Sequence, residues 1–394
     1  MRIFLSALSR FTSPTGICRH AAGLAKSLDA QQEISHISLA LGSWQRDYFE
    51  SAFNISALKK VECINVDLPN NSLRRNLWFG AGLPALAERT KSHVMHLSFP
   101  VPFLVKRPIK TVVTLHDLYP YDFPENIGYP KVYIVRAILR SCLANSDAIT
   151  CVSDSTLNRL KSAIQISNDK PVVAIPNAID FTDVEPQKPV WVGSRPFVLM
   201  VAQHRANKNL GLALDGFERM LSTGVVAADS ELIIVGSSGP ETPAVQEAIR
   251  RKNLADRLKL ASSIREDELR WLYEHCLFFL ATSSVEGFCI PLIEAMHFDS
   301  RVVCSDIPVF REIGSATCCY FDLSNNPVQG MTDAARRGLQ LSTQGHDYPA
   351  SRYSTKEIGK QYVALYKQLT EKPQFLGEAV SSSSKVASAD VHPI

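Results

Sequence analysis

The sequence contains no run of about 18 apolar residues, so nothing in it predicts a membrane-spanning helix. Its first residues, MRIFLSALSR, form an apolar run of strand length and lack the hydrophobic region and cleavage site of a signal peptide. The nine cysteines form no CxxC pair, and most lie in apolar runs, as buried thiols in a reducing compartment do. We therefore expect a cytoplasmic protein that is able to rest on the inner face of the cytoplasmic membrane.

Charge of one sign is also scarce. The net charge is +3, which is too small to indicate nucleic acid as the main partner. Residues 1–185 carry the excess, with 20 basic against 16 acidic side chains. A solvated surface explains this mild imbalance, and an N-terminal half that approaches anionic lipid head groups is a second interpretation. The first strand is not followed by a GxGxxG pattern, which disfavours a dinucleotide-dependent oxidoreductase.

What the sequence does contain is an alternation of strand-like and helix-like runs over 394 residues, too many for one ordinary core. A first cycle includes the strand patterns RIFLSAL, HISLALG, VMHLSF, TVVTLHD and AITCVS. Helix patterns cover residues 17–28 and the segment after Tyr129, where Ile134, Ala137, Ile138, Leu139 and Cys142 fall at helical spacing. Such alternation predicts an α/β fold with a parallel sheet covered on both faces.

A second cycle begins near residue 196, with the strand patterns FVLMVA, ELIIVG, LKLA, LFFLAT and RVVCS. Helix patterns cover 209–222, 241–253, 266–275 and 290–298. The junction holds four prolines without periodicity, which places the boundary within 176–195. We predict domains over 1–185 and 186–355, a helix over 356–376 that packs back toward the first domain, and a disordered Ser-rich tail over 377–394. Two facing sheets leave a ligand cleft between the carboxyl ends of their strands.

The strongest motif is EGFCIPLIE, which lies between the strand pattern LFFLAT and the following helix. Glu286 falls in the loop and Glu294 inside the helix, while Gly287 allows close approach of the backbone to a ligand and Pro291 suits a first helical turn. An acidic residue at a helix start is ordinary for stability, and for an isolated pair of glutamates that interpretation would prevail. The full string EGFxxPLxEAM after a strand favours function.

The helix start in this motif has the chemistry of an anion site. The free N–H groups of Phe288, Cys289 and Ile290 are expected to point, with the helix dipole, at an anion such as a diphosphate. Glu286 then lies where a sugar attached to that diphosphate would be, and Glu294 is placed to hold ribose hydroxyls.

Further motifs lie before and after EGFCIPLIE in the chain. They are PTGICRHAAGLA, TVVTLHDLYPYDFPE, CVSDST, IPNAID, VAQHRANKNLGLALDGF, ELIIVG, LKLASSIREDELRWLY, EGFCIPLIEAM and SDIPVFREI. Over roughly residues 1–370 this series resembles glycosyltransferase family 4, retaining enzymes of the GT-B fold with two Rossmann-like domains that face each other across a cleft. The relatives it resembles most are bacterial mannosyl- and rhamnosyltransferases of O-antigen or exopolysaccharide synthesis.

The resemblance implies a cationic site for the donor diphosphate. Lys208 would pair with the diphosphate, and Arg205 would supply a second cation. Many relatives place an arginine five residues before the lysine, where this chain has Gln203, so Arg205 would compensate for the missing charge. Gly16, after the first strand, would let the backbone close over the same diphosphate, although Pro-Thr-Gly is also ordinary turn chemistry.

The resemblance also implies roles for residues on the N-terminal side. His116 would lie against the reacting sugar, holding donor hydroxyls or the acceptor and supporting oxocarbenium-like charge through the nearby backbone carbonyl. Asp117 would contact the acceptor or cap the following loop, and Arg19 would face acceptor or phosphate. Trp78 lies in segment 71–88, which predicts an amphipathic helix packed on the first sheet, with a face that is also able to bind acceptor or lipid. The expected wall of the nucleobase site is formed by Gly236, Ser237, Ser263 and Ile264.

No Asp-x-Asp triplet occurs in the chain, in agreement with a transferase that needs neither a metal nor a cofactor. The resemblance implies transfer of a hexose from a nucleotide sugar, with GDP-mannose or GDP-rhamnose favoured and UDP-sugars open, to a growing polysaccharide or a lipid-linked glycan such as a polyprenyl-linked one. The leaving phosphate would itself take the acceptor proton, unlike the paired acids of a hydrolase. An epimerase, a phosphorylase and a non-catalytic relative are the alternatives, and Lys208, Glu286 and Glu294 disfavour the last.

Overall fold

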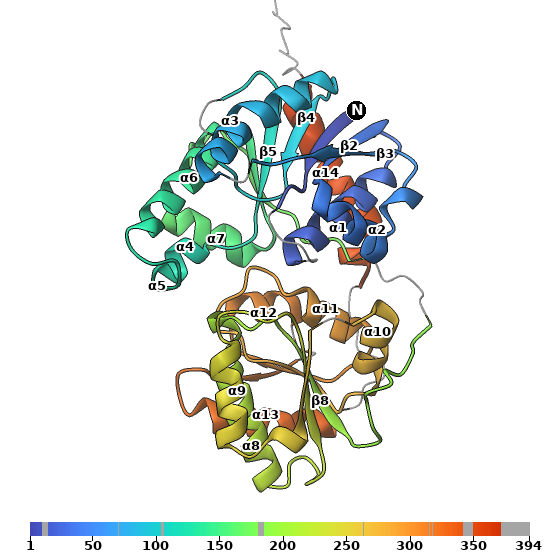
Figure 1. Ribbon diagram of the computed structural model, residues 1–394, viewed down its shortest axis with the longest axis vertical. Helices are drawn as coiled ribbons and strands as arrows, with labels where there is room; N and C mark the ends of the chain where they lie inside the picture. The colour runs from blue at the N-terminus through green and yellow to red at the C-terminus, as the bar shows by residue number, and fades with distance from the viewer. Residues whose placement is uncertain are drawn as a thin grey trace, which may run out of the picture.

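The computed structural model describes residues 1–9, 15–69, 71–103, 106–179, 185–262, 264–314, 316, 318–341 and 350–371. Ser263 and the tail 377–394, both named above, lie outside these residues. Within the described part of the chain, the strands form two separate parallel sheets, one of seven and one of six strands. Figure 1 shows the two domains that result, stacked along the long axis of the molecule.

The first sheet has the strand order β3-β2-β1-β4-β5-β6-β7. Its strands are β1 (Arg2–Ser6), β2 (His36–Gly42), β3 (Val61–Val66), β4 (Val94–Leu97), β5 (Lys110–Leu115), β6 (Ala148–Cys151) and β7 (Val172–Ala174). The helices of this domain are α1 (Gly16–Asp29), α2 (Arg46–Phe53), α3 (Ser72–Arg89), α4 (Tyr119–Asp122), α5 (Pro124–Ile127), α6 (Lys131–Asn145) and α7 (Asp154–Ala163).

Both faces of this sheet are covered, because successive side chains of a strand point to opposite faces. Ile3 and Leu5 of β1 pack in one core with α1, and Phe4 between them packs in a second core with α3 and α6. All three side chains are fully buried. A strand that is buried on both sides reads as a continuous apolar run, which is why RIFLSAL shows no polar alternation.

The second sheet has the order β10-β9-β8-β11-β12-β13. Its strands are β8 (Phe197–Val201), β9 (Glu231–Val235), β10 (Leu258–Ala261), β11 (Phe279–Ala281), β12 (Val302–Ser305) and β13 (Cys318–Phe321). Its helices are the short turn η3 (Ala206–Lys208), α8 (Leu210–Ser222), α9 (Thr242–Arg251), α10 (Glu266–His275), α11 (Ile290–His297), α12 (Pro308–Gly314) and α13 (Pro327–Gln340). Helices α10, α11 and α12 pack in one core of this sheet, and α8 and α13 in the other.

The chain crosses between the domains twice. The outgoing segment after β7 and the returning segment before α14 (Thr355–Thr370) lie side by side at a β-bridge between Ile179 and Ser354. Helix α14 then packs on α1 of the first domain, as Figure 1 shows, with Tyr362 and Tyr366 fully buried.

The expectation of two Rossmann-like α/β domains is confirmed. The helix expected after Tyr129 forms as α6, and Leu139 and Cys142 of its predicted apolar pattern are buried. Ile134 and Ala137 of the same pattern are exposed, and Val132 and Leu143 complete the buried face. The sequence interpretation also did not name β3, β7 and β13 as strands.

Candidate active site

The predicted site residues follow the strands at which the sheet order reverses. This point lies between β1 and β4 in the first sheet and between β8 and β11 in the second. In open parallel sheets, ligands bind beyond the carboxyl ends of the strands at such a point. The loop after β1 leads to Gly16, the loop after β8 carries Arg205 and Lys208, and the loop after β11 carries Glu286. The topology therefore brings residues from distant segments to one place.

Lys208 and Glu286 form an ion pair in which the lysine Nζ donates to Glu286 Oε1. The Ser283 hydroxyl donates to the same oxygen at 2.7 Å. Burial alone would lower the pKa of Lys208, but the Glu286 carboxylate outweighs this cost and the pKa is raised. Lys208 is thus a fixed cation, held beside a carboxylate whose second oxygen, Oε2, has no protein partner within the described residues.

Arg205 lies three residues before Lys208, at the start of η3, and its side chain is exposed. Its positive charge acts on Lys208 and opposes protonation there, so the two cations are close. Within the part of the chain that the structure describes, Arg205 makes no ion pair. It remains available to an anionic ligand, and its role as a second phosphate-binding cation stays a prediction.

The start of α11 presents free backbone donors. The N–H groups of Phe288, Cys289 and Ile290 have no hydrogen-bond acceptor among the described residues, and Pro291 has no N–H. Cys289 is the N-cap and has a φ of 106°, a region that side-chain-bearing residues rarely adopt. Three consecutive free amides at a helix start are the donors that an anion requires, and the anion site expected from the sequence stays a prediction.

Glu294 lies one turn further along α11 and is held from two sides. The Tyr273 hydroxyl, from α10, donates to its Oε2 at 2.9 Å, and Arg19 Nη1, from α1 of the other domain, lies 3.4 Å from its Oε1. Arg19, which was expected to face acceptor or phosphate, is thus placed against Glu294. Burial and the charge of Glu294 raise the pKa of Tyr273 well above its ordinary value, so the phenol remains a donor.

The N-terminal side of the cleft presents histidines. His116 follows β5 and donates from Nε2 to the Ser98 carbonyl at 2.8 Å, and the His20 ring meets it edge to face at 4.7 Å. Burial lowers the pKa of His116 below its ordinary value, and burial and the neighbouring His116 lower that of His20. Both rings are therefore neutral near pH 7, and only His116 is partly exposed, because His20 is buried behind it.

The two domains touch directly at Gly287. A Cβ atom there would lie 1.6 Å from the His116 carbonyl oxygen, so only glycine fits. The Gly287 carbonyl accepts hydrogen bonds from the hydroxyls of Ser153 at 2.6 Å and Thr156 at 3.1 Å. The sequence predicted a close approach of Gly287 to a ligand; the group that it approaches in this structure is the backbone of the other domain.

A second contact holds the domains together beside Gly287. Glu312 of α12 accepts hydrogen bonds from the N–H groups of Asp154 and Ser155, both at 2.9 Å, at the start of α7. A carboxylate at a helix N-terminus satisfies free donors and interacts favourably with the helix dipole. Glu312 and Gly287 together fix the C-terminal domain on one end of α7.

Other predicted residues have more local contacts. Asp117 caps the loop after β5, because its Oδ1 accepts from Tyr119 N–H at 3.0 Å. Gly16 begins α1 with open space around it, and Gly236 packs so tightly on the Ala202 carbonyl that a Cβ would lie 1.9 Å from it. Trp78 packs partly buried against the core beneath α3.

Among the remaining residues of the expected nucleobase wall, the Ser237 carbonyl accepts from His204 N–H at 3.2 Å, and Ile264 packs against the core beneath α10. None of the described contacts of Trp78, Ser237 or Ile264 reaches Lys208, Glu286 or Glu294.

The sequence interpretation missed Tyr273, Ser283 and Glu312. Tyr273 is 21 residues from its partner Glu294, and Glu312 is more than 150 residues from α7, so only the fold connects them. Ser283 is three residues before Glu286 and was the one that spacing alone could have indicated.

Metal-ligating groups and membrane-crossing helices were also sought within the described ranges. No three His, Cys, Asp or Glu side chains there come together as a metal site, and no helix there is both long and apolar enough to cross a bilayer. All nine cysteines are free thiols, and six of them are buried.

Two family models match the chain in succession. Glycosyltransferase Family 4 matches residues 14–183, and Glycosyl transferases group 1 matches residues 181–317. The O-antigen chain mannosyltransferase RfbU of Salmonella typhimurium is 25% identical over 320 residues, which cover 79% of this chain and 84% of the relative. The O-antigen chain mannosyltransferase B of Escherichia coli is 23% identical over 387 residues, which cover 90% of this chain and 96% of the relative.

Solved structures show the same architecture. Anabaena HepE in complex with UDP and glucose superposes with a TM-score of 0.63 at 16% identity, over 94% of this chain and 96% of HepE. Since the two family models succeed each other over two facing parallel-sheet domains, the chain belongs to glycosyltransferase family 4 and is a glycosyltransferase of the GT-B fold.

Proposed function

We propose that the chain transfers a mannose residue from a GDP-sugar, with retention at the anomeric carbon, to a growing polysaccharide or a lipid-linked glycan of the O-antigen type. The observation that carries this proposal is a group of cations and free amides on the side of the cleft that the C-terminal domain forms, here called the C-terminal face. This group consists of Lys208, Arg205 and the start of α11. Hydrogen-bond donors and cations of this kind stabilise the charge that develops on a leaving diphosphate.

The mechanism follows from what the cleft offers. The anomeric C–O bond to the diphosphate breaks, and the acceptor oxygen attacks from the same face and passes its proton to a phosphate oxygen. Glu286 already accepts from Lys208 and Ser283, which suits a carboxylate that holds sugar hydroxyls better than one that takes a proton. His116, with Nε2 donating to Ser98, contributes a neutral wall and its backbone carbonyl beside Gly287.

The relatives favour mannose, because two of them that span most of this chain are named O-antigen mannosyltransferases. Mannose is commonly activated as GDP-mannose. HepE binds UDP, which keeps a UDP-sugar as the second candidate. Glu294, held by Tyr273 and Arg19, is proposed to bind the ribose in either case, because both nucleotides carry the same 2′- and 3′-hydroxyls.

The N-terminal domain is proposed to rest on the inner leaflet of the cytoplasmic membrane. Leu73 and Leu77 of α3 and Tyr133 and Ile134 of α6 are each more than half exposed, which is the composition of an interfacial helix face. Vesicle sedimentation tests this: we expect binding to vesicles that contain phosphatidylglycerol and little to phosphatidylcholine, and the variant Leu77→Ser with Ile134→Ser to bind less.

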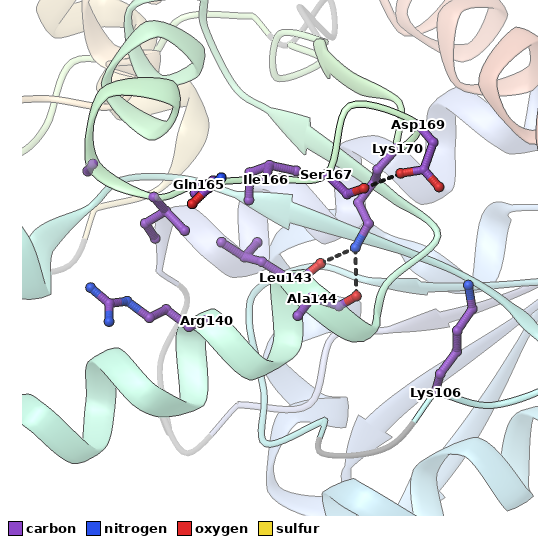
Figure 2. Close-up of a pocket in the computed structure, with 11 residues that line it drawn as sticks. Lys106, Arg140, Leu143, Ala144, Gln165, Ile166, Ser167, Asp169 and Lys170 are labelled. Carbon is purple, nitrogen blue, oxygen red and sulfur yellow. Dashed lines mark hydrogen bonds between the residues drawn. The ribbon is translucent and has the colours of Figure 1, made fainter.

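A groove of about 660 Å³ beside the end of α6 adds positive charge to this domain. Figure 2 shows Lys106, Arg140 and Lys170 around it, with Leu143 and Ile166 between them. Lys170 donates to the carbonyls of Leu143 and Ala144. Burial and the charge of Lys106 lower the pKa of Lys170. Asp169 also lines the groove, so Lys106, Arg140 and Lys170 leave an excess of positive charge that would favour a nearby lipid phosphate.

A nucleotide-release screen tests the enzymatic proposal. The purified chain is mixed with GDP-mannose, GDP-rhamnose and a set of UDP-sugars, and free nucleotide is measured with and without acceptor glycans. We expect release from GDP-mannose, unchanged by EDTA because no metal is required. Release from a UDP-sugar alone would replace the donor, and the absence of release from every donor would reject the enzymatic proposal in favour of a non-catalytic relative.

A further inference from the structure

Besides the groove beside α6, the structure has a cavity of about 190 Å³ that lies between the two domains, next to Glu286. From the N-terminal domain it is lined by Asp117, by Asp122 of α4 and by Ser155 and Arg159 of α7. From the C-terminal domain it is lined by Ser284, Glu286 and the apolar segment 307–309. Pockets for drug-sized ligands have roughly 300–1,000 Å³, so this cavity has room for about one sugar ring.

The charge of the cavity wall is negative. Three carboxylates line it, those of Asp117, Asp122 and Glu286, against the single guanidinium of Arg159. That guanidinium already pairs with Asp122, since Nε and Nη2 lie 2.9 and 2.7 Å from Asp122 Oδ1. Lys208, outside the lining, neutralises Glu286 and still leaves an excess of one negative charge.

The same carboxylates offer acceptors to hydroxyl groups. Among the described residues, Asp117 Oδ2, Asp122 Oδ2 and Glu286 Oε2 accept no protein hydrogen bond. Ionised carboxylates are acceptors only, and a sugar ring presents several hydroxyl donors. An anionic group would meet like charge in a confined space, where repulsion is poorly screened.

We propose that this cavity binds the reacting sugar of the acceptor and that its carboxylates restrict this sugar to a neutral, hydroxyl-rich one. The chain therefore extends an existing glycan and does not add a first sugar beside the phosphate of a carrier. This inference rests on the proposed glycosyltransferase reaction, because Glu286 borders both the cavity and the ion pair with Lys208.

The test compares acceptors of the same sugar that carry either a neutral methyl group or a charged phosphate at the anomeric oxygen. Methyl α-glycosides of mannose, galactose and glucose are assayed against the corresponding α-sugar 1-phosphates, with the full chain and the donor that the release screen identifies. We expect kcat/KM to be at least about tenfold higher for the neutral member of the preferred pair, with the ratio shrinking at high salt. Equal rates, or preference for the 1-phosphate, would overturn the proposal.

Two variants connect this preference to the cavity. Asp122→Asn removes one charge, and Asp117→Asn removes another while its amide oxygen is still able to cap Tyr119 N–H. Each is expected to lower the neutral-to-phosphorylated ratio several-fold, and the exposed control Glu247→Gln on α9 to leave it unchanged. Cooperative thermal unfolding checks that each variant folds.

The outcomes separate two kinds of failure. If both aspartate variants keep the wild-type ratio, the cavity does not select the acceptor. Nucleotide release with the opposite acceptor preference rejects this inference alone, whereas no release from any donor rejects the proposed reaction itself.

Discussion

The two faces of the cleft differ in the charge of the groups that they present. The C-terminal face carries Lys208, Arg205 and three free amides, which are fixed or partial positive charges. The N-terminal face carries His116 and His20, whose pKa values are lowered so that both rings are neutral. Under the proposed function, the first set of groups would hold the donor diphosphate, and the neutral His116 would border the sugar.

This difference implies that neither face is sufficient alone. The anion-binding residues lie in one domain and the neutral wall in the other, so a complete site requires the domains to meet. Gly287 and Glu312 provide that meeting, through the His116 carbonyl and the start of α7. The comparison predicts that changes on the C-terminal face affect charge stabilisation most, and that the N-terminal face responds to protonation.

The largest effect is expected from Lys208→Ala. It removes the fixed cation at the proposed diphosphate site and leaves Glu286 with Ser283 as its remaining donor. Loss of one such charge-stabilising donor typically costs about 10²–10³ in rate. We expect a fall of that size in kcat/KM for transfer. The matched control is Lys367→Ala on α14, which removes an exposed ion pair with Glu33. A decrease in kcat/KM of less than about threefold for Lys208→Ala would contradict the comparison.

A smaller effect is expected from Glu294→Ala on nucleotide binding. The variant removes the carboxylate that Tyr273 and Arg19 hold, and with it the proposed contact to ribose. Hydrogen bonds to charged groups contribute about 1.5–3 kcal/mol, so we expect the Kd for GDP to rise roughly 10- to 100-fold. Calorimetry with GDP and UDP measures this. Glu357→Ala on α14 is the control. If Glu294→Ala binds GDP and UDP with unchanged affinity, Glu294 does not bind the ribose.

The histidines behind the N-terminal face are tested by pH at the buried His96, whose ring centroid lies 6.5 Å from that of His20. His96, buried between Tyr366 and Thr114, has its pKa lowered to about 3 by burial and by the nearby His116. Because the folded pKa lies below the unfolded value near 6.5, the stability from neutral His96 is present above pH 6.5 and is lost as the pH falls toward 3.

One histidine of this kind changes the free energy of unfolding by about 1.4 kcal/mol per pH unit, or about 2 kcal/mol between pH 6.5 and 5. Urea unfolding at several pH values measures the slope. We expect His96→Gln to flatten it and His275→Gln, on α10 of the other domain, to leave it alone. Equal slopes in wild type and His96→Gln would show that the buried histidines do not set the acid sensitivity of this domain.

How far the sequence predicts this structure depends on the range of each interaction. The runs RIFLSAL and ELIIVG predict buried strands because all their residues except Arg2, Ser6 and Glu231 are apolar or glycine, and EGFCIPLIE predicts a loop followed by a helix start. The segment Cys318–Phe321 is also apolar but only four residues long, and β13 was missed. The exposed Ile134 shows the limit of periodicity, because the same helical pattern also held Leu139 and Cys142, which are buried. Pairs such as Glu312 with α7 depend on how the domains meet, which no local pattern encodes.

The smallest effect concerns the backbone of the anion site itself. Cys289 has a φ of 106° at the start of α11. Glycine adopts such a φ without strain, whereas a residue with a side chain loses about 1–2 kcal/mol of conformational free energy there. Cys289→Gly and Cys289→Ala both remove the thiol, but only glycine relieves the backbone, so the glycine variant should be more stable by about 1 kcal/mol in urea unfolding. If the two variants are equally stable, the strain is absent in solution. If glycine is more stable but releases nucleotide more slowly, the cysteine holds the three amides in the geometry that the anion requires.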